Sequence, residues 1–375
     1  MITISDQFDS GNINVVKADS VSDIQLEIRK DNASDFYQWF HFRLEAPIGE
    51  QCKLTIKNCG ESAYPSGWKN YQVCTSYDRQ NWFRTPTVFE NGELKFDLEI
   101  QQSSVYFSYF APYSHERHLD LIAWSEADTR VVNETLGQTI DGRSMHLLNI
   151  SDTSSPKHKV WIIARQHPGE SMAEWFVEGL LQALLNEDNP LATKLLQTTQ
   201  FYIVPNMNPD GSARGNLRTN TAGSNLNREW LEPSMEKSPE VFLVRERMQQ
   251  TGGDIFLDIH GDEALPYNFV AGCEGVPNFS EKILKQQNLF KSAYQHISPD
   301  FQTKFGYPIA EDGKADLRIA TNWLGNHFKT LSFTLEMPFK DNDNLPNPLT
   351  GWSPERSMQL GADILFPISQ TLQSK

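Results

Sequence analysis

The hydrophobic pattern of this chain changes its period about a third of the way along, and that change constrains the fold more than any other feature. Between about residues 13 and 112, apolar and polar residues alternate with a period of two, which is the pattern of strands that bury one face. Turn-rich stretches such as APIGEQ and NCGESAYPSG separate the strands. The pattern predicts an antiparallel β-sandwich without a helix of ordinary length. Its clearest inward faces are Phe40, Phe42 and Leu44; Cys52, Leu54 and Ile56; and Leu94, Phe96, Leu98 and Ile100.

After about residue 118, short continuous apolar runs alternate with helical patterns. Strands that are apolar on both faces and alternate with helices indicate a sheet covered by helices on both sides. A chain of 375 residues is also too long for one ordinary core. We therefore predict a β-sandwich domain over residues 1–118 and an α/β domain over residues 119–375. The apolar runs cover residues 146–150, 160–164, 201–205, 254–259 and 331–337, and helices are expected over 171–186, 238–250 and 281–296.

Composition narrows the classes of function. The formal net charge is −15 and the isoelectric point is near 5.1, so the chain would repel a phosphate backbone and we expect no nucleic-acid partner. The mean hydropathy of −0.50 and the lack of any run of about 18 apolar residues argue against a membrane span. The first residues lack the features of an export signal, and the four cysteines form no CxxC pair, which is typical of a reducing compartment. We expect a cytoplasmic protein without a membrane partner; the oligomeric state is not predicted.

The start of the helix over residues 171–186 has a recognisable pattern. Ser171 and Glu174 have the spacing of a capping box, in which each side chain would bond a free backbone N–H of the first turn. This prediction places Glu170 immediately before the helix.

Polar side chains follow several of the apolar runs at the point where each run ends. His167 and Glu170 follow residues 160–164, and Asn206 and Asn208 follow residues 201–205. In an open α/β sheet, ligands and catalytic groups gather beyond the carboxyl ends of the strands. We therefore expect these residues to converge at one edge of the sheet with two others, His260 after residues 254–259 and Glu336 near the end of residues 331–337.

Two imidazoles and a carboxylate are a donor set suited to catalytic zinc, which takes three protein ligands and keeps a fourth position for water. His167, Glu170 and His260 supply such a set, and Glu336 would then be free to act as general base. The spacing alone leaves a second assignment open, because His260 and Glu263 form another HxxE pair, with His167 as the third ligand. The remaining histidines are expected to be structural: His41, His115, His118, His146, His158, His296 and His327.

Five motifs in order carry a resemblance to a known family. HPGES at 167–171, NPDG at 208–211, RGNLRTNTAGSNLNREW at 214–230, DIHGD at 258–262 and FTLEMPF at 333–339 together resemble the zinc metallocarboxypeptidases of family M14. The likeness is greatest to the cytosolic carboxypeptidase subfamily. The stretches YQWFHFRL and YFSYFAPYSHERHLDLI of this chain resemble the β-sandwich that precedes the catalytic domain in that subfamily. The resemblance implies an α/β zinc-carboxypeptidase-type catalytic domain, with a mixed sheet and helices on both faces, preceded by an antiparallel β-sandwich.

The resemblance also implies a role for each matching residue. It assigns one Zn²⁺ per chain to His167, Glu170 and His260, which favours HPGE as the metal-binding pair. It makes Glu336 the general base, Arg218 the group that polarises the scissile carbonyl, and Asn227 with Arg228 the pair that holds the substrate's terminal carboxylate. The activity expected is hydrolysis of the C-terminal peptide or isopeptide bond of a peptide or protein.

The segment over residues 206–230 supports a substrate clamp independently, because a loop of this length without periodicity is usually functional or disordered. Tyr307 is a candidate for the tyrosine with which the family covers its substrate, and Arg318 is either a contact for an acidic side chain or a surface residue. Two alternatives stay open. One is a zinc amidase that cleaves an N-acyl amino acid or a cell-wall peptide, and the other is a non-catalytic protein that binds a protein or glycan.

Overall fold

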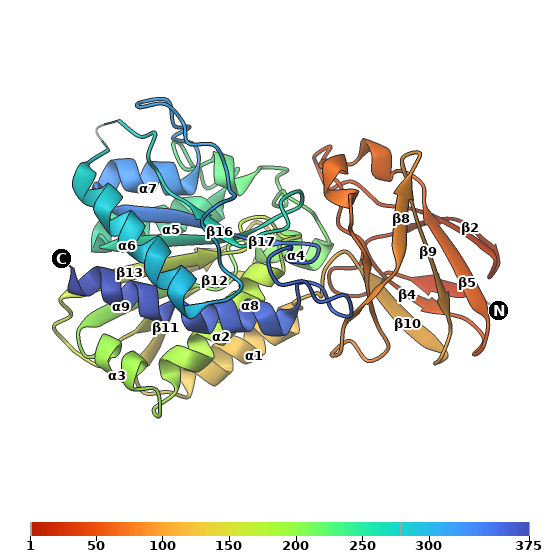
Figure 1. Cartoon of the computed structure of the whole chain (residues 1–375), viewed down its shortest axis with the longest axis horizontal. Helices are drawn as coiled ribbons and strands as arrows, with labels where there is room; N and C mark the ends of the chain where they lie inside the picture. The colour runs from red at the N-terminus through yellow and green to blue at the C-terminus, as the bar shows by residue number, and fades with distance from the viewer. Residues whose placement is uncertain (1, 278, 375) are drawn as a thin grey trace.

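The computed structural model describes residues 2–277 and 279–374, which form two parts side by side (Figure 1). The N-terminal part, red to orange in Figure 1, is built from two five-stranded sheets, and the remainder surrounds one seven-stranded sheet. This arrangement confirms the predicted fold class. No helix within the described ranges is long and apolar enough to cross a membrane.

The N-terminal part is a sandwich of two sheets, and the inward faces predicted by the period-two pattern are buried in it, except that Leu98 is only half-buried. One strand pair departs from the prediction, because β3 and β5 run parallel. Between β3 and β5 the chain forms β4, which belongs to the other sheet, so β5 can run in the same direction as β3. One sheet contains, in order, β1 (Thr3–Ser5), β4 (His41–Glu45), β10 (Ser104–Ser108), β6 (Val73–Ser76) and β7 (Phe83–Thr85); the other contains β2 (Asn14–Ser20), β3 (Asp23–Glu27), β5 (Gln51–Ile56), β9 (Glu93–Glu99) and β8 (Thr87–Glu90).

The seven-stranded sheet is mixed. Its four inner strands are mutually parallel, whereas the three strands at its two edges run antiparallel to their neighbours. The predicted apolar runs correspond to the four parallel strands and to β12. The order is β11 (Val131–Gln138), β12 (Ser144–Ile150), β14 (Thr199–Val204), β13 (His158–Ala164), β15 (Ile255–Asp262), β17 (Leu331–Pro338) and β16 (Phe269–Ala271).

Helices cover both faces of this sheet, as the apolar strands require. Along β13, Val160 and Ile162 pack into one core, while Trp161 and Ile163 pack into a second core on the opposite face. The three predicted helices correspond to α2, α5 and α6. The first core receives α2 (Met172–Leu185), α3 (Pro190–Leu196), α6 (Glu281–Ile297), α8 (Pro354–Asp363) and α9 (Leu365–Gln373), and the second receives α5 (Pro239–Thr251) and α7 (Ala320–Phe328).

The division between the two parts stays a proposal. Helix α1 (His115–Glu126) contains position 118, the boundary expected from the sequence. A division within residues 111–114, ahead of this helix, would leave both parts with complete elements.

The predicted capping box at the start of α2 is wrong. The Ser171 hydroxyl donates to the backbone oxygen of Ala111 at 2.9 Å and makes no cap bond. Glu174 is fully buried, and its carboxylate instead accepts hydrogen bonds from Arg165 at 2.8 Å and Asn206 at 3.0 Å. A buried guanidinium beside this carboxylate provides a stronger partner than a backbone N–H would.

Candidate active site

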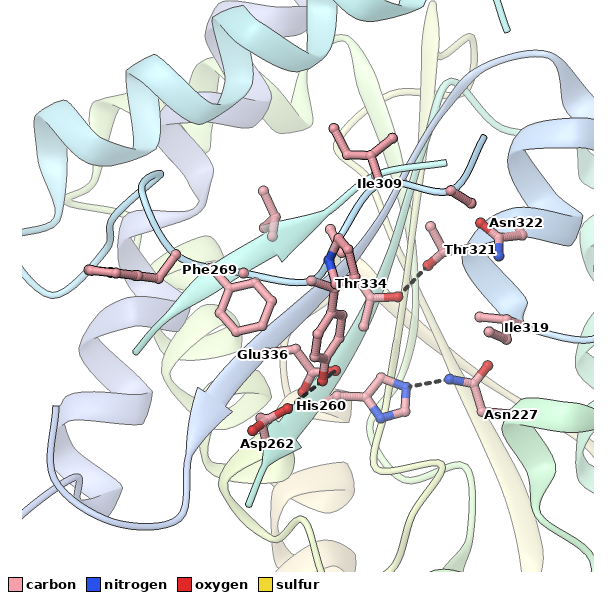
Figure 2. Close-up of a pocket in the computed structure, with 18 of the residues that line it drawn as sticks. Asn227, His260, Asp262, Phe269, Ile309, Ile319, Thr321, Asn322, Thr334 and Glu336 are labelled. Atoms are coloured by element: carbon pink, nitrogen blue, oxygen red, sulfur yellow. Dashed lines mark hydrogen bonds between the residues drawn. The ribbon is translucent and has the colours of Figure 1, made fainter. Parts of the chain in front are cut away.

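Parallel pairing of β15 and β17 determines where two of the predicted site residues lie. His260 and Glu336 are direct partners in the register of these strands. Alternate residues of a strand lie on the same face of the sheet. Asp258 and Asp262 therefore share a face with His260, and Thr334 shares a face with Glu336. Figure 2 shows His260, Glu336 and Asp262 together at the base of a pocket, with Asn227 approaching His260 from the other side. The predicted convergence is present for His260 and Glu336, whereas Asn206 and Asn208 do not line the pocket.

His167 and Glu170 enter the site from the sharp turn between β13 and α2. Arg165 begins this turn in the left-handed region, with a φ of 58°. Gly169 allows a close approach to the clamp loop, because a Cβ there would lie 3.0 Å from the backbone oxygen of Leu217. The Gly169 amide donates to that same oxygen at 2.9 Å. The HPGE turn is therefore attached to the loop that carries Arg218.

Three potential metal ligands converge in this turn and on β15. His167, Glu170 and His260 each offer one donor atom, and the three atoms lie within 4.8 Å of one another. The Glu170 carboxylate lies between the two rings, with Oε1 2.6 Å from Nδ1 of His167 and Oε2 2.7 Å from Nδ1 of His260. All three side chains are buried. Within the described residues, this is the one such group.

The far nitrogen of each imidazole is held by an oxygen acceptor. Nε2 of His167 lies 3.1 Å from Oδ1 of Asn225, and Nε2 of His260 lies 2.8 Å from Oδ2 of Asp258. The Asn225 oxygen also accepts from the Asn227 amide at 3.1 Å, which fixes the orientation of its side chain. An acceptor at Nε2 can hold the proton there, and each Nδ1 lone pair would then be free to bind a metal, as metal-binding histidines require. The donor set therefore fits a zinc ion bound through both Nδ1 atoms and Glu170.

Glu263, the carboxylate of the second HxxE pair, does not join the group of donors. It lines the same pocket. Burial, with the Glu170 carboxylate as the next cause, raises the pKa of Glu263 to about 8. The geometry therefore favours the HPGE pair over the HGDE pair.

Glu336 is a buried carboxylate, and only one of its two oxygens has a hydrogen-bond partner among the described residues. Its Oε1 accepts a hydrogen bond from the Tyr307 hydroxyl at 2.9 Å, and that hydroxyl also lies 2.6 Å from Oδ2 of Asp262. Its Oε2 is buried and has no hydrogen-bond partner among the described residues. Burial raises the pKa of Glu336 well above its usual range, and the nearby Glu170 and Asp262 carboxylates raise it further.

The predicted clamp residues line the same pocket. Arg218, Asn227 and Arg228 all contribute to its wall. Asn227 accepts from the Ala320 amide at 2.8 Å through Oδ1, and its Nδ2 lies 3.3 Å from Nε2 of His260. Arg228 is half-buried and donates to the Asn227 backbone oxygen at 2.7 Å. Burial, followed by the proximity of Arg218, lowers the pKa of Arg228. Both arginines line the same cavity.

The pocket has a volume of about 830 Å³ and is large enough for several residues of a peptide. Tyr307 lies at its wall, with a ring centroid 5.0 Å from that of Phe269. Thr321 and Thr334 also line the cavity and share a 2.7 Å hydrogen bond (Figure 2). Arg318 is outside the pocket; its side chain is 60% exposed and pairs with Asp316 at 2.8 Å, so it is a surface residue.

Several contributing residues were not identified from the sequence. Asp258 is two positions before His260, and the alternation of a strand could have placed it on the same face. Asn225 lies in the SNLNR motif already noted. No local pattern points to Tyr64, which reaches the pocket wall from the N-terminal part.

Comparison with known proteins agrees with this geometry. One family model, described as the cytosolic carboxypeptidase N-terminal domain, matches residues 4–110. A second, described as zinc carboxypeptidase, matches residues 117–358. Among curated proteins, cytosolic carboxypeptidase 6 of Caenorhabditis elegans is 26% identical over 88% of this chain and 77% of its own length.

Solved structures are similar over the whole chain. The metallo-carboxypeptidase of Burkholderia cenocepacia has a TM-score of 0.98 and 49% identity, with 100% of both chains covered. The metallo-carboxypeptidase of Pseudomonas aeruginosa, in complex with (2-guanidinoethylmercapto)succinic acid, has a TM-score of 0.97 and 44% identity over 99% of both chains. Because the zinc carboxypeptidase model matches more than half of the chain, the chain belongs to the M14 family of zinc carboxypeptidases, with the N-terminal domain of the cytosolic carboxypeptidases, and it is a metallocarboxypeptidase.

Proposed function

We propose that the protein binds one zinc ion through His167, Glu170 and His260 and hydrolyses the C-terminal peptide or isopeptide bond of a peptide or protein. The observation that carries this proposal is the convergence of three ligand atoms, within 4.8 Å of one another, beside a buried carboxylate that is not a ligand. When bound, zinc would polarise the scissile carbonyl and lower the pKa of a water molecule to about 7. Because the chain belongs to a family of hydrolases, we no longer consider the alternative of a non-catalytic binding protein.

Glu336 is the proposed general base. Its Oε2 has no partner among the described residues. The positive charge of a bound zinc would favour the ionised carboxylate, and this oxygen could then accept a proton from the attacking water. The water oxygen becomes part of the new carboxylate, the C–N bond breaks, and Glu336 returns the proton to the leaving amine. A positioned group of this kind contributes about 10²- to 10⁴-fold to the rate.

Arg218 and Arg228 are proposed to bind the two oxygen-bearing groups of the substrate. Arg228, with Asn227, would hold the terminal carboxylate, since a guanidinium offers a planar fork that matches it. Arg218 would stabilise the negative charge that develops on the carbonyl oxygen. A clamp for a free carboxylate would make the enzyme an exopeptidase.

The ligand of a similar protein is consistent with this clamp. The Pseudomonas aeruginosa structure contains a derivative of succinic acid, which carries carboxylates and a guanidino group. We propose that such dicarboxylic acids bind this chain as well.

The four cysteines are buried and form no disulfide, and we propose a reducing compartment such as the cytoplasm for that reason.

The clamp can be tested with a matched pair of peptides and a matched pair of variants. Native protein is expected to hydrolyse a peptide with a free C-terminus and to leave its C-terminal amide intact. Arg228→Ala should lower kcat/KM for the free peptide by about 10- to 100-fold, because hydrogen bonds to charged groups are lost. Arg318→Ala, an exposed control, should leave kcat/KM unchanged. N-acyl amino acids in the same panel test the amidase alternative, which preferential cleavage of those compounds would favour.

A further inference from the structure

The loop that carries Arg218 is fastened to the N-terminal domain, and not only to the catalytic domain. Helix α4 (Pro209–Arg214), which begins this segment, lies beside the N-terminal part in Figure 1. The Ser10 amide donates to the backbone oxygen of Ala213 at 3.0 Å, and Asn12 donates to that of Gly215 at 2.8 Å. Asn32 donates to the backbone oxygen of Thr221 at 2.6 Å and accepts from Asn216 at 2.7 Å.

Asp31 makes the most concentrated of these contacts. Asp31 as a whole is 3% exposed. Oδ1 accepts from the Leu217 amide at 2.6 Å, while Oδ2 accepts from the amides of Arg218 at 2.8 Å and Thr219 at 2.9 Å. The Thr219 hydroxyl donates to Oδ2 as well, at 3.1 Å. One carboxylate therefore binds three consecutive amides, with Arg218 in the middle.

Two aromatic rings of the N-terminal domain hold the other end of Arg218. The guanidinium carbon lies 5.7 Å from the ring centroid of Phe36 and 5.4 Å from that of Tyr64. Aromatic faces attract a cation at such distances without occupying its hydrogen-bond donors. No carboxylate of the described residues forms an ion pair with Arg218, so its donors stay available to a substrate in the pocket.

We propose that Asp31 is a positioning residue for Arg218, and that the N-terminal domain supplies part of the active site through Asp31, Phe36 and Tyr64. The proposal rests on the proposed function, in which Arg218 stabilises the developing oxyanion. Such stabilisation depends on donors that are in place before the reaction, and a displacement of about 1 Å can cost about 100-fold in rate. Asp31 fixes the backbone from which this side chain extends, and the two rings fix its direction.

A double-mutant cycle tests this role. Kcat and KM for a C-terminal peptide, together with zinc per chain, are measured for native protein, Asp31→Asn, Arg218→Ala and the double variant. Asp31→Asn is expected to lower kcat by about 10- to 100-fold, to change KM less than about threefold and to leave the zinc content unchanged. In the Arg218→Ala background the same change should lower kcat less than about twofold, because coupled residues are not additive.

The control is another aspartate of the same domain. Asp78 also accepts from two backbone amides, those of Gln80 and Asn81, at 2.8 and 2.7 Å. These bonds stabilise the turn that contains Asp78 itself and do not reach the catalytic domain. Asp78→Asn should leave kcat unchanged. Equal losses from Asp31→Asn in both backgrounds, or zinc lost in step with activity, would overturn the proposal, because Asp31 would then serve only the fold.

A second readout separates this proposal from the proposed function. If native protein and Glu336→Gln hydrolyse the peptides equally poorly, the proposed function fails, and amide hydrogen exchange then tests Asp31 alone. Asp31→Asn should speed exchange at Leu217, Arg218 and Thr219 by about tenfold or more, with β15 unchanged. Unaltered exchange at these three amides would overturn the positioning role.

Discussion

Replacing Glu336 with glutamine is expected to abolish nearly all hydrolysis while the protein keeps its zinc. Glutamine has the shape of glutamate but cannot accept and return a proton, so the loss in kcat should be about 10²- to 10⁴-fold, the usual contribution of a general acid–base group. The variant should fold normally. Glu336 is buried beside Asp262 and Glu170, and removing one of several crowded carboxylates relieves repulsion.

The measurement is kcat for a peptide with a free C-terminus, paired with zinc per chain by elemental analysis. Glu263→Gln is the matched control, since Glu263 is a buried carboxylate in the same pocket. It should retain much more activity than Glu336→Gln. A Glu336→Gln variant with near-native kcat, or a Glu263→Gln variant that is equally inactive, would show that the base has been misassigned.

Replacing Glu170 with glutamine should remove the metal itself. Its two oxygens lie 2.6 and 2.7 Å from Nδ1 of His167 and His260, so this carboxylate is the central member of the donor set. Loss of an outer partner alone usually costs about 10- to 100-fold in metal affinity, and loss of a ligand should cost at least about 100-fold. Activity at limiting zinc should fall in proportion.

Zinc affinity is measured by competition with a chelator, for Glu170→Gln and Glu263→Gln in parallel. Glu263→Gln should bind zinc almost as native protein does, because Glu263 is outside the group of donors. The opposite pattern would transfer the ligand role to the HGDE pair, the assignment that spacing alone left open.

Strand alternation carried most of the information that the sequence provides about the fold. The period-two faces around Phe42 and Leu54 are buried as predicted, since a strand with one wet face must alternate. Continuous apolar runs located the parallel strands because helices cover both of their faces. The parallel pairing of β3 with β5 was not predictable in this way, because alternation determines which face is buried but not which neighbour lies alongside.

The candidate site was predictable to the extent that it depends on strand ends. His260 and Glu336 lie on neighbouring strands, and their positions after apolar runs were enough to expect them together. The choice between the two HxxE pairs was not settled by spacing, because a turn and a strand end can each present a histidine and a glutamate. That choice depends on tertiary geometry, in which Glu170 lies between two rings.

Contacts between side chains far apart in the sequence escaped prediction altogether. Asp31 accepts a hydrogen bond from the Arg218 amide, 187 positions away, and Tyr64 approaches the same arginine from the N-terminal domain. The capping box predicted from Ser171 and Glu174 was wrong for the same reason. Their spacing fits a capping box, but both side chains bond buried tertiary partners instead. Local patterns describe contacts within a few residues, and tertiary contacts can outweigh them.

The central claim is most directly tested by measuring zinc content and peptide hydrolysis on the same sample of native protein. The account predicts about one zinc per chain, hydrolysis of a peptide with a free C-terminus, loss of that hydrolysis after the metal is chelated, and recovery when zinc is returned. A native protein that binds no zinc, or that hydrolyses these peptides equally well with and without it, would contradict the account.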